Sequence, residues 1–168
     1  MIFQTPLFLY LNMEILLIFG TIICLIFAGK LAFHYYNKNK EKIFLESLSG
    51  KNIIRLNDID TDIDVSSSKS LYNYQINKST IILLDNHIFL LTRSKIFNVA
   101  QPILQISKIG NNENFPCVWE EINYISKQQV DYKIKIKGFS KRRLTKINYR
   151  IILDFTDTKF DLAYFKLQ

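Results

Sequence analysis

Residues 15–33 read ILLIFGTIICLIFAGKLAF, and this stretch decides the architecture that we expect. As an α-helix rising 1.5 Å per residue, the uncharged run of residues 15–29 would span roughly 22 Å, short of a bilayer core of about 30 Å. Continuing the helix to Phe33 makes up the difference and places Lys30 near the headgroups. The sequence therefore predicts a single N-terminal transmembrane α-helix over about residues 15–33, within a membrane anchor of residues 1–36.

Two other interpretations of this stretch fit less well. A cleaved signal peptide needs positive charge before the apolar run and small residues at its cleavage site. No Lys or Arg precedes Lys30, and Phe27 interrupts the small-residue pattern. A buried core helix would show polar residues at helical spacing, whereas this run is apolar all round. We therefore expect the helix to be retained as a signal anchor, with Met13 as an alternative start of the chain.

The basic residues beside the predicted span indicate its orientation. No Lys or Arg precedes the span, and four lysines follow its uncharged part, namely Lys30, Lys38, Lys40 and Lys42. By the positive-inside rule, we expect the N-terminus outside and the soluble domain in the cytoplasm. The alternative is an extracytoplasmic domain that forms a structural component of an envelope assembly.

After the span, we expect a helical stalk over residues 37–50 and a β-rich soluble domain over residues 51–168. In the stalk, Phe44, Leu45 and Leu48 lie on one stripe of a helix, and Gly50 is typical of a helix stop. The expected strands are residues 53–65, 71–76, 80–84, 87–92, 96–99, 103–107, 132–137, 146–155 and 160–165. One short helix is expected to open at Pro116 and to bury Val118, Trp119, Ile122 and Ile125.

These short, closely spaced strands favour a mostly antiparallel β domain over alternating strands and helices. The expected fold is a sandwich or a partly open barrel or roll. A pleckstrin-homology-like roll also fits the number of strands, by analogy of fold alone.

The positive charge of the chain is concentrated in one predicted hairpin. The 168 residues carry 22 Lys and Arg against 15 Asp and Glu, a net charge of +7. The window of residues 127–150 holds nine basic residues and one acid, and therefore carries +8 by itself. Residues 132–137 read YKIKIK, which as a strand places three lysines on one face. The candidate residues for binding an anionic partner are Lys133, Lys135, Lys137, Lys141, Arg142, Arg143, Lys146 and Arg150.

This basic hairpin predicts a membrane-anchored, non-enzymatic interaction module. Its partner would be the anionic lipid headgroups of the cytoplasmic leaflet or an acidic protein. Nucleic acid is disfavoured, because no recognised binding motif accompanies the charge. A solvated strand face, whose lysines prevent edge-to-edge aggregation, would give the same pattern. The sequence does not indicate the oligomeric state.

A second charged strand is expected at residues 58–65, which read DIDTDIDV and place aspartates on one face. The aspartates match three ligand positions of a calcium loop. However, Ile63 stands where that loop needs glycine, and Lys69 stands where it needs a bidentate glutamate. We therefore expect an exposed acidic face, which could pair with the basic hairpin within one chain or between chains.

No set of side chains predicts catalysis, a metal site or a cofactor. His34 is expected at the membrane edge, and His87 directly follows a two-residue hairpin turn. Cys24 is expected in lipid and Cys117 in the soluble domain, which predicts neither a disulfide nor a metal cluster. An enzyme with an unrecognised site remains the alternative.

Overall fold

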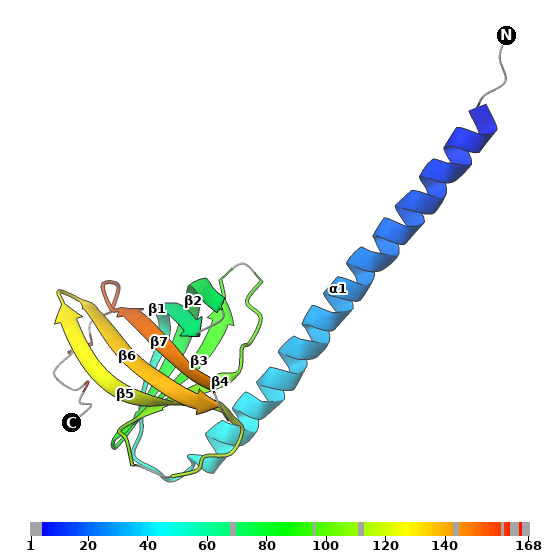
Figure 1. The fold of residues 1–168 in the computed structure, drawn as a ribbon. Helices are drawn as coiled ribbons and strands as arrows, with labels where there is room; N and C mark the ends of the chain where they lie inside the picture. The colour runs from blue at the N-terminus through cyan, green and yellow to red at the C-terminus, as the bar shows by residue number, and fades with distance from the viewer. Residues whose placement is uncertain are drawn as a thin grey trace.

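A long N-terminal helix, α1 (Thr5–Ser47, 43 residues), projects from a β-barrel in the computed structural model (Figure 1). The structure describes residues 5–67, 70–95, 97–110, 113–142, 145–158, 160, 161 and 165. By length and composition, the segment Met13–Ser47 of α1 can cross a membrane, and none of its most apolar window is buried. The apolar helix predicted around residues 15–33 is therefore present, and it continues without interruption through most of the expected stalk.

Seven strands close into a barrel in the order of the sequence, with β7 pairing back onto β1. Every neighbouring pair is antiparallel except β4 and β5, which run parallel. The strands are β1 (Ile54–Ser67), β2 (Ser70–Leu84), β3 (His87–Ser94), β4 (Ile103–Ser107), β5 (Val118–Val130), β6 (Lys133–Arg142) and β7 (Thr145–Asp154). Of the expected architectures, the barrel is the one present, in closed rather than partly open form.

Alternate residues along each strand fill the barrel. In β6, Ile134 and Ile136 are fully buried, and in β7 Ile151 and Leu153 are fully buried as well. The lysines and aspartates between the apolar residues of β6 and β1 point outward, because successive side chains of a strand face opposite ways. The alternation in the sequence therefore predicted correctly which face of these strands lies in the core.

The predicted helix opening at Pro116 is wrong. Residues 118–130 form strand β5, in which Ile122 is fully buried while Trp119 and Ile125 are 56% and 55% exposed. The apolar spacing suited a helix because β5 carries apolar residues on both of its faces. Such a pattern does not distinguish the helical period of 3.6 residues from the strand period of 2. The described residues after α1 therefore contain no α-helix.

Three strand predictions also need correction. Residues 97–99 belong to the connection between β3 and β4, and Ile96 lies outside the described residues. The predicted strand over 160–165 is wrong at its described positions, residues 160, 161 and 165, which are not in a strand. The segments expected at 71–76 and 80–84 are parts of one strand, β2.

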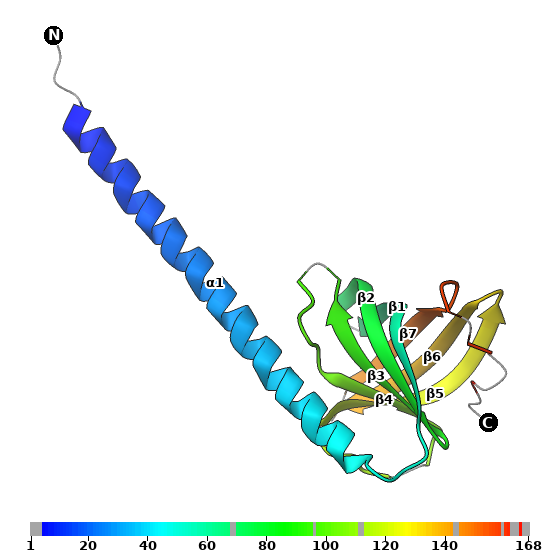
Figure 2. The same cartoon turned by 180° about the vertical axis from the view of Figure 1, so that it is seen from behind.

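The last turns of α1 pack against the outer surface of β2, β3 and β4 (Figure 2). Phe44 and Leu48 are 0% and 2% exposed, and the Phe44 ring lies 4.9 Å from that of Phe89, centroid to centroid. This second apolar cluster comprises Phe44, Leu48, Ile82, Leu84, Phe89, Leu91 and Ile103. Strand β3 is therefore buried on both faces, inside by the barrel core and outside by α1.

Polar contacts extend this docking towards the apolar part of α1. The backbone N–H of Ala100 donates a hydrogen bond to His34 Nδ1 (3.1 Å), and Asn37 Nδ2 donates to the Ala100 carbonyl (3.2 Å). Glu41 Oε1 lies 3.1 Å from Arg93 Nη2 in an ion pair. The helix is thus fixed to the barrel by apolar packing at its end and by hydrogen bonds and an ion pair before it.

Candidate functional site

One end of the barrel, which we call the proximal end, faces the apolar part of α1. The helix runs antiparallel to β3, since Phe44 lies against Phe89, Glu41 pairs with Arg93, and His34 bonds the residue where the β3–β4 connection ends. From the strand pairing, the proximal end of the barrel holds the last residues of β1, β3 and β6. It also holds the first residues of β2, β4, β5 and β7. In Figure 1 the connection between β3 and β4 stands beside α1 and extends towards its N-terminal half.

The β3–β4 connection carries an apolar side chain to the end of the predicted span. Phe97 is 56% exposed, and Lys30 Nζ lies 4.3 Å from the centroid of its ring. Lys30 is the first charged residue after the uncharged run. This contact therefore places the β3–β4 connection beside the C-terminal end of that run, along the axis of α1.

Strands β6 and β7 pair along their full length, with Lys133 opposite Asp154 and Lys141 opposite Lys146. Lys133, Lys137, Lys141, Lys146 and Arg150 are exposed on the outer face, and Lys135 is half-buried there. The hairpin turns at the proximal end after Arg142. Arg143 lies outside the described residues, and for Arg142 the structure describes only the backbone.

The acidic strand β1 lies on the other side of β7, with Asp64 opposite Arg150 and Asp60 opposite Asp154. Arg150 Nε lies 3.4 Å from Asp64 Oδ2, and Lys133 Nζ lies 2.8 Å from Asp154 Oδ2. Two of the candidate basic residues are therefore paired with acids of the same barrel. The pairing between acidic and basic faces that the sequence left open occurs within one chain.

Titration of the Lys133–Asp154 pair follows from this contact. The hydrogen bond from Lys133, and then that from Thr156, lower the pKa of Asp154 to about 2. The hydrogen bond and charge of Asp154 raise the pKa of Lys133, and the nearby charge of Asp62 raises it further. Each group thus favours the charged form of the other.

Near the tip, the hairpin brings like charges together instead. Lys141 stands directly opposite Lys146, and Lys137 stands opposite Arg150. Like charges at directly opposed positions of a strand pair are destabilising. Lys146 Nζ lies 4.6 Å from the centroid of the Phe139 ring, a cation–π contact that does not neutralise its charge. The tip is therefore the part of the hairpin that a bound anion would stabilise.

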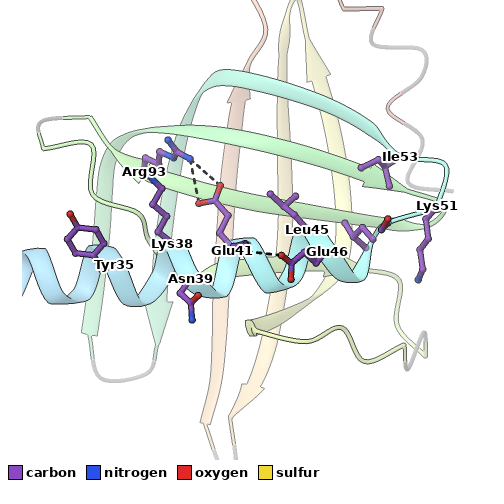
Figure 3. A pocket seen from close by; sticks show the side chains of 13 residues that line it. Tyr35, Lys38, Asn39, Glu41, Leu45, Glu46, Lys51, Ile53 and Arg93 are labelled. Atoms are coloured by element: carbon purple, nitrogen blue, oxygen red, sulfur yellow. Dashed lines mark hydrogen bonds and ion pairs between the residues drawn. The ribbon is translucent and has the colours of Figure 1, made fainter.

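A groove of about 1060 Å³ runs along the junction of α1 and the barrel (Figure 3). Its wall holds the Glu41–Arg93 ion pair, and its rim carries Lys38, Lys42 and Lys51 together with Glu46. The groove is lined by both acidic and basic side chains, and it lies in the angle between the helix and the barrel wall. We assign it no chemistry.

The two histidines each contact a residue distant in the sequence, and the two cysteines form no disulfide. His34 accepts the Ala100 hydrogen bond, and His87 is 2% exposed, with Nδ1 3.2 Å from Gln105 Nε2. Cys24 and Cys117 are free thiols. Among the described residues, no three His, Cys, Asp or Glu side chains are grouped so that they could hold a metal ion.

Sequence reasoning missed a cavity at the proximal mouth of the barrel, of about 350 Å³. Glu120, which is 6% exposed, lines it together with Trp119 and Tyr149. These residues come from β5 and β7, so no linear motif unites them. Once β5 is known to be a strand, alternation turns Glu120 inward and Glu121 outward.

No family model matches this chain, and the searches of curated proteins and of solved structures found no match either.

Proposed function

We propose that this chain is a membrane-anchored, non-enzymatic interaction module whose hairpin tip contacts anionic lipid headgroups. In this proposal α1 crosses the bilayer, and the lysines that follow the span keep the barrel on the cytoplasmic side. The observation that carries the proposal is the docking of α1 onto β2–β4, because a barrel held against α1 would keep one orientation to a bilayer that α1 crosses.

With residues 15–33 in the bilayer, His34 and Asn37 lie just outside it. Their hydrogen bonds to Ala100 support a position of the β3–β4 connection in the headgroup region. Exposed Phe97 is suited to this depth, where aromatic side chains are enriched. In this proposal the β3–β4 connection faces the membrane surface, and the hairpin tip approaches the surface from the same end of the barrel.

The charge at the tip suits an anionic surface. Each Lys or Arg near anionic lipid contributes about 1 kcal/mol, so Lys141 and Lys146 together would contribute about 2 kcal/mol. The attraction falls off within a Debye length of about 8 Å at physiological ionic strength, so it requires the tip to come that close to the headgroups. Phosphate groups between Lys141 and Lys146 would also relieve their mutual repulsion.

The contact can be tested on the full chain in nanodiscs. Cys24 and Cys117 are replaced by Ser, and Thr145→Cys beside the tip carries an environment-sensitive fluorophore. We expect its emission to shift to the blue as the anionic share of the lipid rises, and to return as salt is added. The same fluorophore at Asp157→Cys, beyond the opposite end of β7, should not respond.

Matched charge changes sharpen this test. Lys141→Ala combined with Lys146→Ala should abolish the response to anionic lipid. Lys51→Ala combined with Lys108→Ala removes the same charge away from the proximal end and should leave the response intact. A fluorophore at the tip that responds equally to neutral and anionic lipid would overturn the proposal, and would leave an acidic protein as the partner to examine.

Orientation is tested separately by reporters fused after Gln168. Activity of a reporter that works only in the cytoplasm is expected. Activity only of a reporter that requires export would place the barrel on the other side of the membrane and favour the envelope-assembly alternative.

A further inference from the structure

A hollow of about 470 Å³ lies on the outer wall of the barrel, where β7 runs between β6 and β1 (Figure 1). It is separate from the hairpin tip, because neither Lys141 nor Lys146 lines it. Sites for small organic molecules have volumes of roughly 300–1,000 Å³. The hollow is therefore large enough for a ligand of that kind.

Two basic side chains of the hollow stand directly opposite each other. Lys137 of β6 is in register with Arg150 of β7, and both are exposed. Asp64 of β1 lies on the other side of Arg150, with its Oδ2 3.4 Å from Arg150 Nε. Lys137 has no ion pair with any acid in the part of the chain that the structure describes. An anion bound beside Lys137 would relieve its repulsion with Arg150.

Neutral hydrogen-bond donors lie next to this basic pair. Asn148 of β7 stands opposite Ser66 of β1, and both line the hollow. Asn148 shares the outer face of β7 with Arg150, because the two are two residues apart. Within the described residues, neither the Asn148 amide nor the Ser66 hydroxyl has a side-chain hydrogen bond. A guanidinium carries five N–H donors, so the ion pair with Asp64 leaves some of those of Arg150 for a ligand.

An apolar side chain is turned outward beside these donors. Ile125 of β5 lies in a β-bulge, because the register with β6 shifts between Tyr124 and Ser126. Bulges re-aim side chains and are frequent next to active sites. Ile125 is 55% exposed and lines the hollow. It offers an apolar surface to the carbon skeleton of a ligand whose charged group reaches Lys137.

We propose that this hollow binds a phosphate monoester of a small organic group. The phosphate would lie at Lys137, Arg150 and Asn148, and the organic group would pack on Ile125. A monoester carries about −1.5 to −2 charges at pH 7 and three strong acceptor oxygens, which match two cations and the donors beside them. The proposal goes beyond the membrane contact and does not depend on α1 crossing a bilayer. Soluble organic phosphates and phosphatidic acid share this group, and the experiment separates the two sources.

Other charged groups fit the lining less well. A carboxylate brings one charge and two oxygens, which leaves part of the donor set unused. A phosphodiester also brings only one charge. An ammonium group would stand against Lys137, which repels it. A monoester phosphate combines the sign, the charge and the number of acceptors that the hollow offers.

Isothermal titration calorimetry of the full chain in a non-ionic sugar detergent, at constant ionic strength, tests the site. The probes are phenyl phosphate, the diester methyl phenyl phosphate and inorganic phosphate. Saturable binding of phenyl phosphate is expected. The diester should bind about tenfold or more weakly, because it carries a single charge. Inorganic phosphate should also bind more weakly, because it has no organic group to pack on Ile125. Equal affinity for phenyl phosphate and its diester would overturn the proposal.

Three variants test the assigned roles. Lys137→Gln should weaken the binding of phenyl phosphate about tenfold or more. It should not lower the melting temperature of the free protein, because Lys137 has no ion pair among the described residues to lose. Lys135→Gln is the control, since it removes the same charge from the same face of β6 outside the hollow, and it should bind as the original chain does. Ile125→Ala should weaken phenyl phosphate a few-fold and leave inorganic phosphate unchanged.

Equal losses of affinity in Lys137→Gln and Lys135→Gln would show attraction to a diffuse positive surface, and would overturn the proposed site. A comparison of dioctanoyl phosphatidic acid with glycerophosphate assigns the source. Tighter binding of the lipid supports a membrane ligand, and equal binding supports a soluble one. Because these titrations contain no anionic membrane, they can fail while the fluorophore at the hairpin tip still responds, and the reverse can also occur. The two proposals are thereby tested independently.

Discussion

Replacing Phe44 by alanine should release the end of α1 from the barrel while leaving the barrel folded. Phe44 is fully buried between α1 and the sheet, and its ring packs against that of Phe89. The barrel core is a separate cluster that does not include Phe44. The substitution therefore removes packing from the docking surface and none from the inside of the barrel.

The magnitude follows from the burial. Truncating a buried phenylalanine to alanine costs about 3–5 kcal/mol. Every 1.4 kcal/mol is a factor of ten in an equilibrium, so the undocked population should rise about 100-fold or more. Released from the sheet, the end of α1 between the predicted span and Gly50 would fray, because helical structure in proteins depends largely on the tertiary packing of the helix.

Limited proteolysis with trypsin in detergent measures this population. Cleavage after Lys38, Lys40 and Lys42 needs the segment to unfold locally, and when reclosing is fast the rate of cleavage follows the open population. The control is Ile43→Ala, which changes a neighbouring residue that is 42% exposed and should alter the rate little. Equal cleavage rates for Phe44→Ala and Ile43→Ala would refute the docking argument.

Two further predictions concern the barrel. Gly138→Ala should lower the melting temperature, because a Cβ at this position would lie 2.5 Å from Ile122 Cγ2 and 2.8 Å from the backbone oxygen of Asn123. Gly29→Ala, whose added Cβ meets nothing within 4 Å, should not lower it. The depressed pKa of Asp154 predicts a contribution to stability that is present above its ordinary pKa of 3.8 and lost as the pH falls towards about 2. In denaturant unfolding, the free energy of unfolding of Asp154→Asn should fall less on acidification than that of the original chain. An identical loss of stability in the two proteins would contradict this prediction.

The sequence predicted the features that depend on local periodicity. The apolar run of residues 15–33 required only a count of uncharged residues, and α1 is where that count placed a helix. The alternation in residues 132–137 and 146–155 required only that one strand face be buried, and Ile134 and Leu153 are fully buried accordingly. In both cases the hydrophobic pattern is read within one element, so neighbours elsewhere in the chain do not alter it.

The features that were missed depend on contacts between distant segments. Strand β5 lies between a parallel and an antiparallel neighbour, and nothing within residues 118–130 specifies either pairing. A barrel strand needs apolar residues only on its inner face, whereas β3 is apolar on both faces. The docking of α1 explains why the outer face of β3 is also buried. The mouth cavity could not be predicted for the same reason, because Ile63, Glu120 and Tyr149 meet only when the barrel closes.

Closure of the barrel also changes what the net charge of the chain means. Pairing of β1 with β7 brings Asp64 to Arg150, and Asp154 of β7 holds Lys133. These basic residues already have acidic partners in the fold, so they support the barrel wall and offer less to an outside anion. Lys141 and Lys146 face each other instead, and an external anion would turn that repulsion into attraction. Charge removal at Lys133 should therefore act on stability, and charge removal at the tip should act on association with the membrane.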